Sequence, residues 1–358
     1  MQFGLILLQF ALIQLIDMVK CEKPCASFRN TEVRVVDLKG ESYSQSIFGC
    51  IQPNNFGDSA VLEVHVINQD LPRLGRDAVR NMHHLTHLKF NKCSLTTLAP
   101  GCFKGLSRLW YFEASDCGIS SIGYGVFNPL NSLNTVKIYN TDLFEIDNEA
   151  FGFLPSLKNV HLDHNKLEYF NPDWFLNSTN LEVIDLRFNY IRVIEGLSFK
   201  TFHKLKELHL DNNDISSLSK NSFKGLRKLQ HLGLRFNRLK SIPSKLFANS
   251  VKVMRIDLGG NYLNYLPTEL FSKLIVKTAV LDANPWKCEC LQKIHDWLFE
   301  IGADLEKSQY CEEIPICYSL NVGKNTCLET ENEDVTSRYQ QALQSLSSMG
   351  TEFCARLQ

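Results

Sequence analysis

Cysteine is the residue type with the widest chemical scope in this chain. The sequence holds 12 cysteines in 358 residues, clustered toward the two ends. Cys288 and Cys290 form a CxC pair, a spacing that suits disulfides or half of a zinc site. Twelve cysteines are more than a cytosolic chain of this size usually carries, and disulfides persist outside the cell. We therefore expect disulfides rather than zinc, formed among Cys21, Cys25, Cys50, Cys288, Cys290, Cys311, Cys317, Cys327 and Cys354.

The N-terminus supports an extracellular assignment. An apolar run from Phe3 to Ile16, broken only by Gln9 and Gln14, predicts a signal peptide over residues 1–20. The fit is imperfect, because no Lys or Arg follows Met1 and no clean cleavage site precedes Cys21. The alternative is an uncleaved amphipathic helix. No later apolar run reaches membrane-spanning length, and the C-terminal tail lacks a lipid-anchor signal. We expect a secreted protein without a membrane anchor.

Motifs for catalysis are absent from the sequence. It contains no GxSxG, HExxH or CxxC motif and no phosphate-binding glycine loop. The formal net charge is −1, so nothing indicates a nucleic-acid partner. We expect no enzymatic activity, no cofactor and no metal site.

The elements that must position any functional side chain repeat every 24 residues. One column of the repeat is formed by leucines, and two more apolar columns follow it at +3 and +5. A further column at +8 holds Asn in its second half. The leucine column is Leu85, Leu109, Leu133, Leu157, Leu181, Leu205 and Leu229, and the Asn column is Asn165, Asn189, Asn213, Asn237 and Asn261. A tenth unit comes one residue early, with Val276, Ala279, Leu281 and Asn284.

Each column has a physical reason. Side chains alternate faces along a strand, so the two residues of an LxL pair point inward and their neighbours outward. One unit has too little core to fold alone and buries its apolar side against the next unit. The Asn amides can pair with backbone groups that the turn leaves unbonded. Cys93 and Cys117 occupy the same column. We interpret them as reduced thiols, the alternative being a bond between stacked units.

A second ladder consists of phenylalanines spaced by 24 without exception from Phe103 to Phe271. Stacked rings at every unit would fill the far side of the core and widen the outer wall, which should bend the stack. Strands about 4.8 Å apart would line the narrower, concave wall.

The pattern LxxLxLxx(N/C)xL resembles the leucine-rich repeat family. The resemblance implies a solenoid, or horseshoe, of the α/β class, with about ten 24-residue repeats, a concave parallel sheet and disulfide-bonded caps. We divide the chain into a signal peptide (1–20), an N-terminal cysteine cap (21–60), the solenoid (61–284), a C-terminal cap (285–328) and a polar tail with an amphipathic helix (329–358).

Both caps carry cysteines. "CEKPCASF" with Cys50 resembles the N-terminal cap of secreted members, but three cysteines cannot all pair among themselves, so Cys102 or a partner chain would take the spare. "NPWKCECLQKIHDWLFEIG" closely resembles the extracellular C-terminal cap, with a helical stripe at Leu291, Ile294, Leu298 and Ile301 that can cover the last unit. This resemblance implies that Cys288 pairs with Cys311, and Cys290 with Cys317 or Cys327.

An apolar stripe at helical spacing follows in the tail, from Val335 through Tyr339 to Met349. One interpretation is a helix folded back on the cap. The other is a short association helix with Cys354 near its end, able to crosslink a partner. About two heptads are too few for a coiled coil that is stable alone.

The outward positions of the concave sheet are where a ligand could bind, because the repeat leaves them free. Exposed Trp, Tyr, Phe and Arg are the residue types that anchor interfaces. The repeated sequence LRFN places Arg187–Phe188 and Arg235–Phe236 there, although each Phe could instead pack against neighbouring units. Histidines on this surface suggest polar contacts or a pH-sensitive one. The predicted binding residues are Trp110, Tyr111, Tyr139, His161, Arg187, Phe188, His209, Arg235 and Phe236. The sequon "NST" predicts a glycan at Asn177, away from this face.

The closest resemblance is to the mosquito leucine-rich immune proteins, although this chain lacks their paired-cysteine motif and long coiled coil. It implies a secreted, non-enzymatic binding protein of innate immunity that recognises a protein or glycan. The partner would be an extracellular protein such as a complement-like factor or another leucine-rich repeat chain. The alternatives are an adhesion or matrix protein and a soluble co-receptor or decoy.

Overall fold

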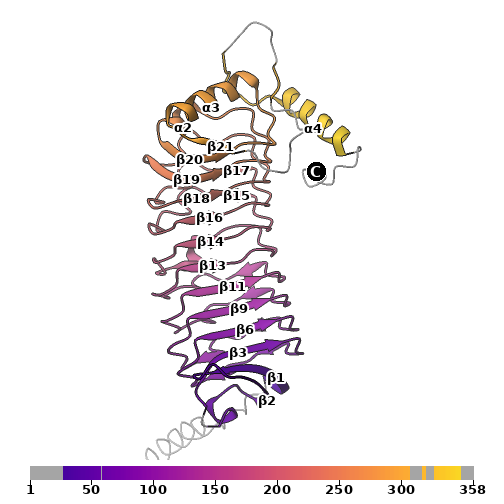
Figure 1. Cartoon of the computed structure of the whole chain (residues 1–358), viewed down its shortest axis with the longest axis vertical. Helices are drawn as coiled ribbons and strands as arrows, with labels where there is room; N and C mark the ends of the chain where they lie inside the picture. Colours follow the sequence, from indigo (N-terminus) through magenta and orange to yellow (C-terminus); the bar gives the residue numbers. More distant parts are fainter. Residues whose placement is uncertain (1–26, 58, 307–316, 320–325, 348–358) are drawn as a thin grey trace, which may run out of the picture.

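The computed structural model describes residues 27–57, 59–306, 317–319 and 326–347. The expected signal peptide and Cys21, Cys25, Cys311 and Cys354 lie outside the described residues. The described part is a long stack of coils that runs from a hairpin at one end to helices at the other (Figure 1). Within it, no helix is long and apolar enough to cross a membrane.

Each coil contributes one strand to a single 13-stranded sheet with the order β2-β1-β3-β6-β9-β11-β13-β14-β16-β18-β19-β20-β21. The antiparallel hairpin at its start is formed by β1 (Phe28–Asp37) and β2 (Ser42–Gly49). The parallel strands are β3 (Val61–Ile67), β6 (His87–Asn91), β9 (Tyr111–Ser115), β11 (Thr135–Tyr139), β13 (Asn159–His161), β14 (Val183–Asp185), β16 (Glu207–His209), β18 (His231–Gly233), β19 (Val251–Asp257), β20 (Leu274–Val280) and β21 (Asp304–Glu306).

The strand register confirms the 24-residue repeat. Phe112 of β9 lies opposite Leu88 of β6 and Val136 of β11, 24 residues away in each direction. The last full step is one residue shorter, as the sequence predicts, because Ile256 lies opposite Ala279. The leucine-rich repeat solenoid of about ten turns is therefore confirmed.

The far side of the coils carries only short elements. Four pairs of two-residue strands and two 3-10 turns alternate with irregular chain. They are β4 (Arg73–Leu74) with β7 (Thr97–Leu98), β5 (Val79–Arg80) with β8 (Phe103–Lys104), β10 (Ser121–Ile122) with β12 (Glu145–Ile146), β15 (Val193–Ile194) with β17 (Ser217–Leu218), η1 (Pro53–Asn55) and η2 (Pro172–Phe175).

The core between the two sides is a continuous apolar column. Residues of the LxL pairs such as Leu162, Leu186 and Leu210 are fully buried. The phenylalanine ladder is real, with ring centroids 5.5 Å apart from Phe127 to Phe151 and again from Phe151 to Phe175. Stacked rings thus connect one coil to the next along the far side of the core.

Helices close the C-terminal end. They are α2 (Thr268–Phe271), α3 (Cys288–Glu300) and α4 (Glu333–Ser347). Three residues of the predicted stripe, Leu291, Ile294 and Leu298, are buried in α3, whereas Ile301 follows the helix and is only partly buried. Trp297 stacks on Phe271 of the last ladder position at 4.6 Å. Val335 and Tyr339 of α4 are also buried. The first half of α4 therefore folds back onto the chain. Ala342 is half-buried, and the other later residues of the apolar stripe lie outside the described side chains.

The disulfides correct one expected pairing and select between the two expected for Cys290. Cys288 is bonded to Cys317, not to Cys311, and Cys290 is bonded to Cys327. Tyr318 forms a bridge with Lys287 beside the CxC pair, and this contact brings the adjacent Cys317 to the start of α3. Cys102 does not take the spare N-terminal cysteine, because it is a buried free thiol. Cys50 is disulfide-bonded, and Cys93 and Cys117 are free, as we expected.

Candidate binding face

The candidate site is the face of the long sheet that points away from the core, which we call the sheet face. Its side chains come from the positions that alternate with the buried apolar residues of strands β3 to β20. The sequence assigned nine binding residues to this face. The structure divides them into an aromatic cluster on the N-terminal coils and an ionic network on the C-terminal coils.

The aromatic cluster consists of His87, Trp110, Tyr111 and Tyr139. Trp110 is 46% exposed, and its ring lies 6.5 Å from Tyr111 and 6.0 Å from His87 between centroids. His87 and Tyr111, on adjacent strands β6 and β9, are 5.3 Å apart. Side chains from three coils thus form one semi-exposed apolar surface with polar edges.

Glu113 holds the two tyrosines in place. The Tyr111 hydroxyl donates to Glu113 Oε2 at 2.5 Å, and the Tyr139 hydroxyl donates to Glu113 Oε1 at 3.1 Å. Burial and the adjacent Glu113 carboxylate raise the pKa of Tyr111. The Lys89 and Lys137 ammonium groups lie 5.3 and 5.9 Å from the centre of the Tyr111 ring, in cation–π range. Because these rings are already fixed, a ligand would lose little side-chain entropy in binding them.

The ionic network begins at the first LRFN copy. Arg187 donates to both oxygens of Asp185, from Nε at 2.9 Å and from Nη2 at 2.7 Å, and His161 Nδ1 lies 3.6 Å from the same carboxylate. Burial opposes ionisation of Asp185, but the hydrogen bonds from His161 and Arg187 outweigh it and hold its pKa well below the usual range. The carboxylate of Asp185 is therefore ionised at neutral pH.

A metal could be considered at this point, because ligand atoms of His161, Asp163 and Asp185 lie within 4.8 Å of one another. Asp185, however, is already bound by the guanidinium of Arg187, and a metal ion there would face that fixed positive charge. The arrangement acts as an ion-pair network. His209, two coils from His161, instead contacts Glu207 at 3.3 Å.

The second LRFN copy differs from the first, and here an expectation needs correction. The Arg235 side chain is only 10% exposed and binds Asp282 through two hydrogen bonds of 3.0 Å, with Asp257 at 3.4 Å. A Cβ at residue 259 would lie 2.3 Å from Arg235 Nη1, so Gly259 leaves the space that the guanidinium occupies. Arg235 is therefore a structural residue, whereas the Arg187 side chain is 44% exposed.

The two phenylalanines of LRFN lie at the end of their strands in left-handed backbone conformation. Phe188 has φ 54° and Phe236 has φ 53°. The same conformation recurs at this column of the repeat in His164 and Asn212. Phe188 stacks on His164 at 4.1 Å and is 38% exposed, whereas the Phe236 ring lies over Gly260 and under the Arg235 guanidinium. Both rings thus pack on neighbouring coils, and Phe188 also remains available to a ligand.

Surplus negative charge surrounds Arg235. Asp211 accepts a hydrogen bond from the backbone N–H of Arg235 at 2.8 Å, and Asp257 and Asp282 contact its guanidinium, so three carboxylates lie near this residue. Burial raises the pKa of Asp257 to about 6, and the neighbouring Asp211 and Asp282 act in the same direction. The C-terminal part of the sheet face is therefore acidic near Arg235. The sequence did not reveal this cluster, because Asp257 and Asp282 come from coils with different local patterns.

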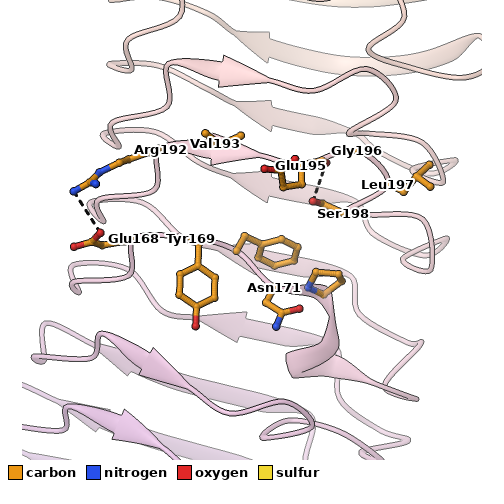
Figure 2. A pocket seen from close by; sticks show the side chains of 11 residues that line it. Glu168, Tyr169, Asn171, Arg192, Val193, Glu195, Gly196, Leu197 and Ser198 are labelled. Carbon is orange, nitrogen blue, oxygen red and sulfur yellow. Dashed lines mark hydrogen bonds and ion pairs between the residues drawn. The ribbon is translucent and has the colours of Figure 1, made fainter.

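A groove of about 620 Å³ lies on the other side of the coils, between the segments around residues 168–172 and 192–198 (Figure 2). Glu168 and Arg192 form an ion pair of 3.3 Å at one end, and Ser198 donates to the backbone carbonyl of Glu195 at 2.9 Å. Its side chains do not converge on a nucleophile with a base. The groove has no sequence motif, because its lining comes from the variable positions of two coils.

Comparisons with known proteins agree with this geometry. The Leucine rich repeat family matches residues 179–239 and 227–276, and the BspA type Leucine rich repeat region (6 copies) matches residues 49–182. No protein with a curated description matches the sequence.

Solved structures include similar chains. A chain of the TLR13–ssRNA13 complex is 26% identical, with a TM-score of 0.59, over 69% of this chain and 35% of that one. This chain thus spans about a third of that relative's length. A chain of the octameric complex of Latrophilin 3, Unc5D and FLRT2 (LRR) is 18% identical over 74% and 90%, with a TM-score of 0.55. A chain of the mouse RP105/MD-1 complex is 22% identical over 72% and 48%, with a TM-score of 0.54. The two family matches together extend from residue 49 to 276 in the region where the coils stack, and the chain belongs to the leucine-rich repeat proteins.

Proposed function

We propose that the chain is a secreted, non-enzymatic protein that binds a protein ligand on its sheet face. The observation that carries the proposal is the aromatic cluster, in which exposed Trp110 lies beside tyrosines that Glu113 immobilises. Rigid aromatic side chains that are partly exposed in the unbound protein are typical of interface hot spots. Phe188 and Arg187 would extend the contact along the face.

Secretion is supported by the cysteines. Cys288–Cys317 and Cys290–Cys327 are disulfides, which persist in oxidising compartments. The three free cysteines of the described residues are all buried, so none of these thiols is exposed to extracellular oxidants.

A role in innate immunity is the more specific part of the proposal. It is supported by the 26% identity to the TLR13 chain, which was solved with ssRNA13, and by the fold shared with the mouse RP105/MD-1 complex. The ligand in this proposal is an extracellular protein, such as a complement-like factor or another leucine-rich repeat chain.

The test is capture of ligands from extracellular fluid by the purified protein, quantified by mass spectrometry. Trp110→Ala should weaken capture of the main ligand at least tenfold, since hot-spot residues contribute about 2 kcal/mol or more. Tyr169→Ala is the matched control, because Tyr169 is 50% exposed but lines the groove away from the sheet face. Equal capture by wild type and the Trp110 variant would contradict the proposal.

A further inference from the structure

One edge of the stack carries an excess of positive charge. The chain turns there from the far side of each coil into the next strand of the sheet. Residues 197–206, 221–230 and 245–254 occupy this position in three consecutive coils and contain eight Lys or Arg and no Asp or Glu. Seven of these eight side chains are exposed, and we call them the basic edge: Lys200, Lys204, Lys224, Arg227, Lys228, Lys245 and Lys252.

The repeat itself does not require this charge. The four equivalent segments of earlier coils, 101–110, 125–134, 149–158 and 173–182, contain three basic residues (Lys104, Arg108 and Lys158) and three acidic ones (Glu149, Asp173 and Glu182). Those coils fold with the same register. Like charges on adjacent coils repel one another, so a clustered excess lowers stability unless a partner of opposite charge compensates it.

The cations of the basic edge have no charged partner in the described part of the chain. In the described part of the chain, none of the seven forms a salt bridge, whereas nearby Lys158 and Lys206 are both paired with Glu182. Lys204 donates to the neutral side chain of Asn180 at 2.5 Å. Seven exposed positive charges thus remain without a carboxylate among the described residues.

A groove of about 540 Å³ runs between these side chains. Lys200, His203, Lys224 and Arg227 line it, and its floor includes Gly225. A Cβ at residue 225 would lie 2.5 Å from the Lys200 carbonyl oxygen, so glycine allows the two coils to approach closely here. His203 Nδ1 lies 3.1 Å from the Gly225 carbonyl oxygen. Because successive strands are about 4.8 Å apart, the basic side chains repeat along the stack at a short spacing.

These features fit an extended, flexible polyanion, and we propose that the basic edge binds a sulfated polysaccharide. A single-stranded nucleic acid would also supply negative charge, but proteins that bind one combine a basic groove with exposed aromatic side chains that stack on bases. The two aromatic rings of this groove, Phe223 and Phe247, are buried in the ladder. The site lies on a different side of the coils from the sheet face and does not depend on the proposed protein ligand.

The experiment measures binding of a heparin decasaccharide to the full-length secreted protein by calorimetry at physiological salt. The triple variant K224Q/R227Q/K228Q should bind at least tenfold more weakly, and raising the salt concentration should weaken the wild type. The matched control is K104Q/R108Q/K158Q, which removes the same net charge from earlier coils and should bind within twofold of wild type. Unchanged melting temperatures would show that both variants fold.

Three results would overturn the proposal. The first is the absence of measurable heparin binding by the wild type. The second is an equal loss in both triple variants, which would indicate an effect of net charge alone. The third is tighter binding of single-stranded polyuridine or of phosphatidylserine vesicles than of heparin, which would assign the edge to a nucleic acid or a membrane surface. Capture through Trp110 should persist in K224Q/R227Q/K228Q, so that this proposal and the proposed function can fail separately.

Discussion

The two LRFN copies show how far a residue's role depends on its neighbours. Leu186 and Leu234 are equally buried, and Asn189 and Asn237 make the same backbone hydrogen bonds. The residues between them differ because Gly259 and Gly260 follow the second copy in the next coil. These glycines create space in which Arg235 and Phe236 lie flat. Identical tetrapeptides thus give one exposed pair and one largely enclosed pair.

Two carboxylates of the sheet face should affect stability in opposite directions. The folded-state pKa of Asp257 is raised to about 6 from 3.8, so the folded protein binds a proton that the unfolded chain releases between about pH 4 and 6. Charged Asp257 therefore lowers stability above pH 6, and this penalty shrinks as the pH falls below 6 and is gone only below about pH 4. Asp257→Asn removes this charge and should raise the free energy of unfolding by about 1 kcal/mol or more at pH 7.5.

Asp185 provides the matched comparison, because its folded-state pKa is depressed. The stability that ionised Asp185 contributes is present above the unfolded-state pKa near 4 and is lost only as the pH falls below that value. Asp185→Asn should therefore cost about 3 kcal/mol at both pH 7.5 and pH 5, since Arg187 loses its charged partner. Urea denaturation at the two pH values distinguishes the variants. A destabilising Asp257→Asn at pH 7.5 would contradict this assignment.

At the scale of the element, the turn after each strand depends on a buried amide. Asn213 donates to the carbonyls of Leu186 and Leu210 at 2.9 and 3.1 Å and accepts from the backbone N–H of Ile191 at 3.0 Å. It thus connects neighbouring coils, and the carbonyls that it binds also accept from Asn189 and Asn237 of the adjacent coils. Cys93 makes an equivalent contact in an earlier coil, where its thiol donates to the Val66 carbonyl at 3.4 Å.

Replacing this amide should loosen the turn. Asn213→Ala removes one donor from each of two buried carbonyls and leaves the buried Ile191 N–H without a partner, which should cost about 2 to 3 kcal/mol. Asn212→Gly is the control, because residue 212 has φ 56°, a conformation that glycine adopts freely, and its effect should stay within about 0.5 kcal/mol. Hydrogen exchange of the Ile191 amide is the direct measurement. Unchanged protection of the Ile191 amide in Asn213→Ala would show that the turn does not depend on the asparagine side chain.

The repeat also shows how much of the structure could be predicted from the sequence. The strands, the coil register and the burial of Leu162, Leu186 and Leu210 follow from a 24-residue period, because each unit repeats the same backbone geometry. The site could be predicted only in part. Trp110 and Phe188 are exposed as expected, but the burial of Arg235 depends on glycines in another coil. The prediction that Cys288 pairs with Cys311 was wrong because the segments after α3 do not follow the 24-residue period.

At the scale of the whole molecule, a solenoid is stabilised by contacts between neighbouring coils, and its ends are the weakest points. The hairpin of β1 and β2 extends the sheet at one end, whereas α3 covers the other (Figure 1). Trp297 is the main aromatic contact of this helix, with its ring stacked on Phe271 at an interplanar angle of 11°. The buried Lys287 adds a polar connection, because its ammonium group donates to the carbonyls of Leu328 and Thr330 at 2.6 and 2.7 Å.

Loss of the Trp297 ring should therefore open the C-terminal end before the rest of the stack. Trp297→Ala should destabilise the cap by about 3 to 5 kcal/mol, the usual cost of deleting a large buried aromatic side chain. Phe299→Ala on the same helix is the control, because Phe299 is 87% exposed and its removal should have almost no effect. Hydrogen exchange should show faster opening of β19 and β20 in Trp297→Ala, with β6 and β9 unchanged. Uniform loss of protection along the sheet would instead mean that the coils unfold as one cooperative unit, and that the cap holds the entire solenoid rather than its last coils.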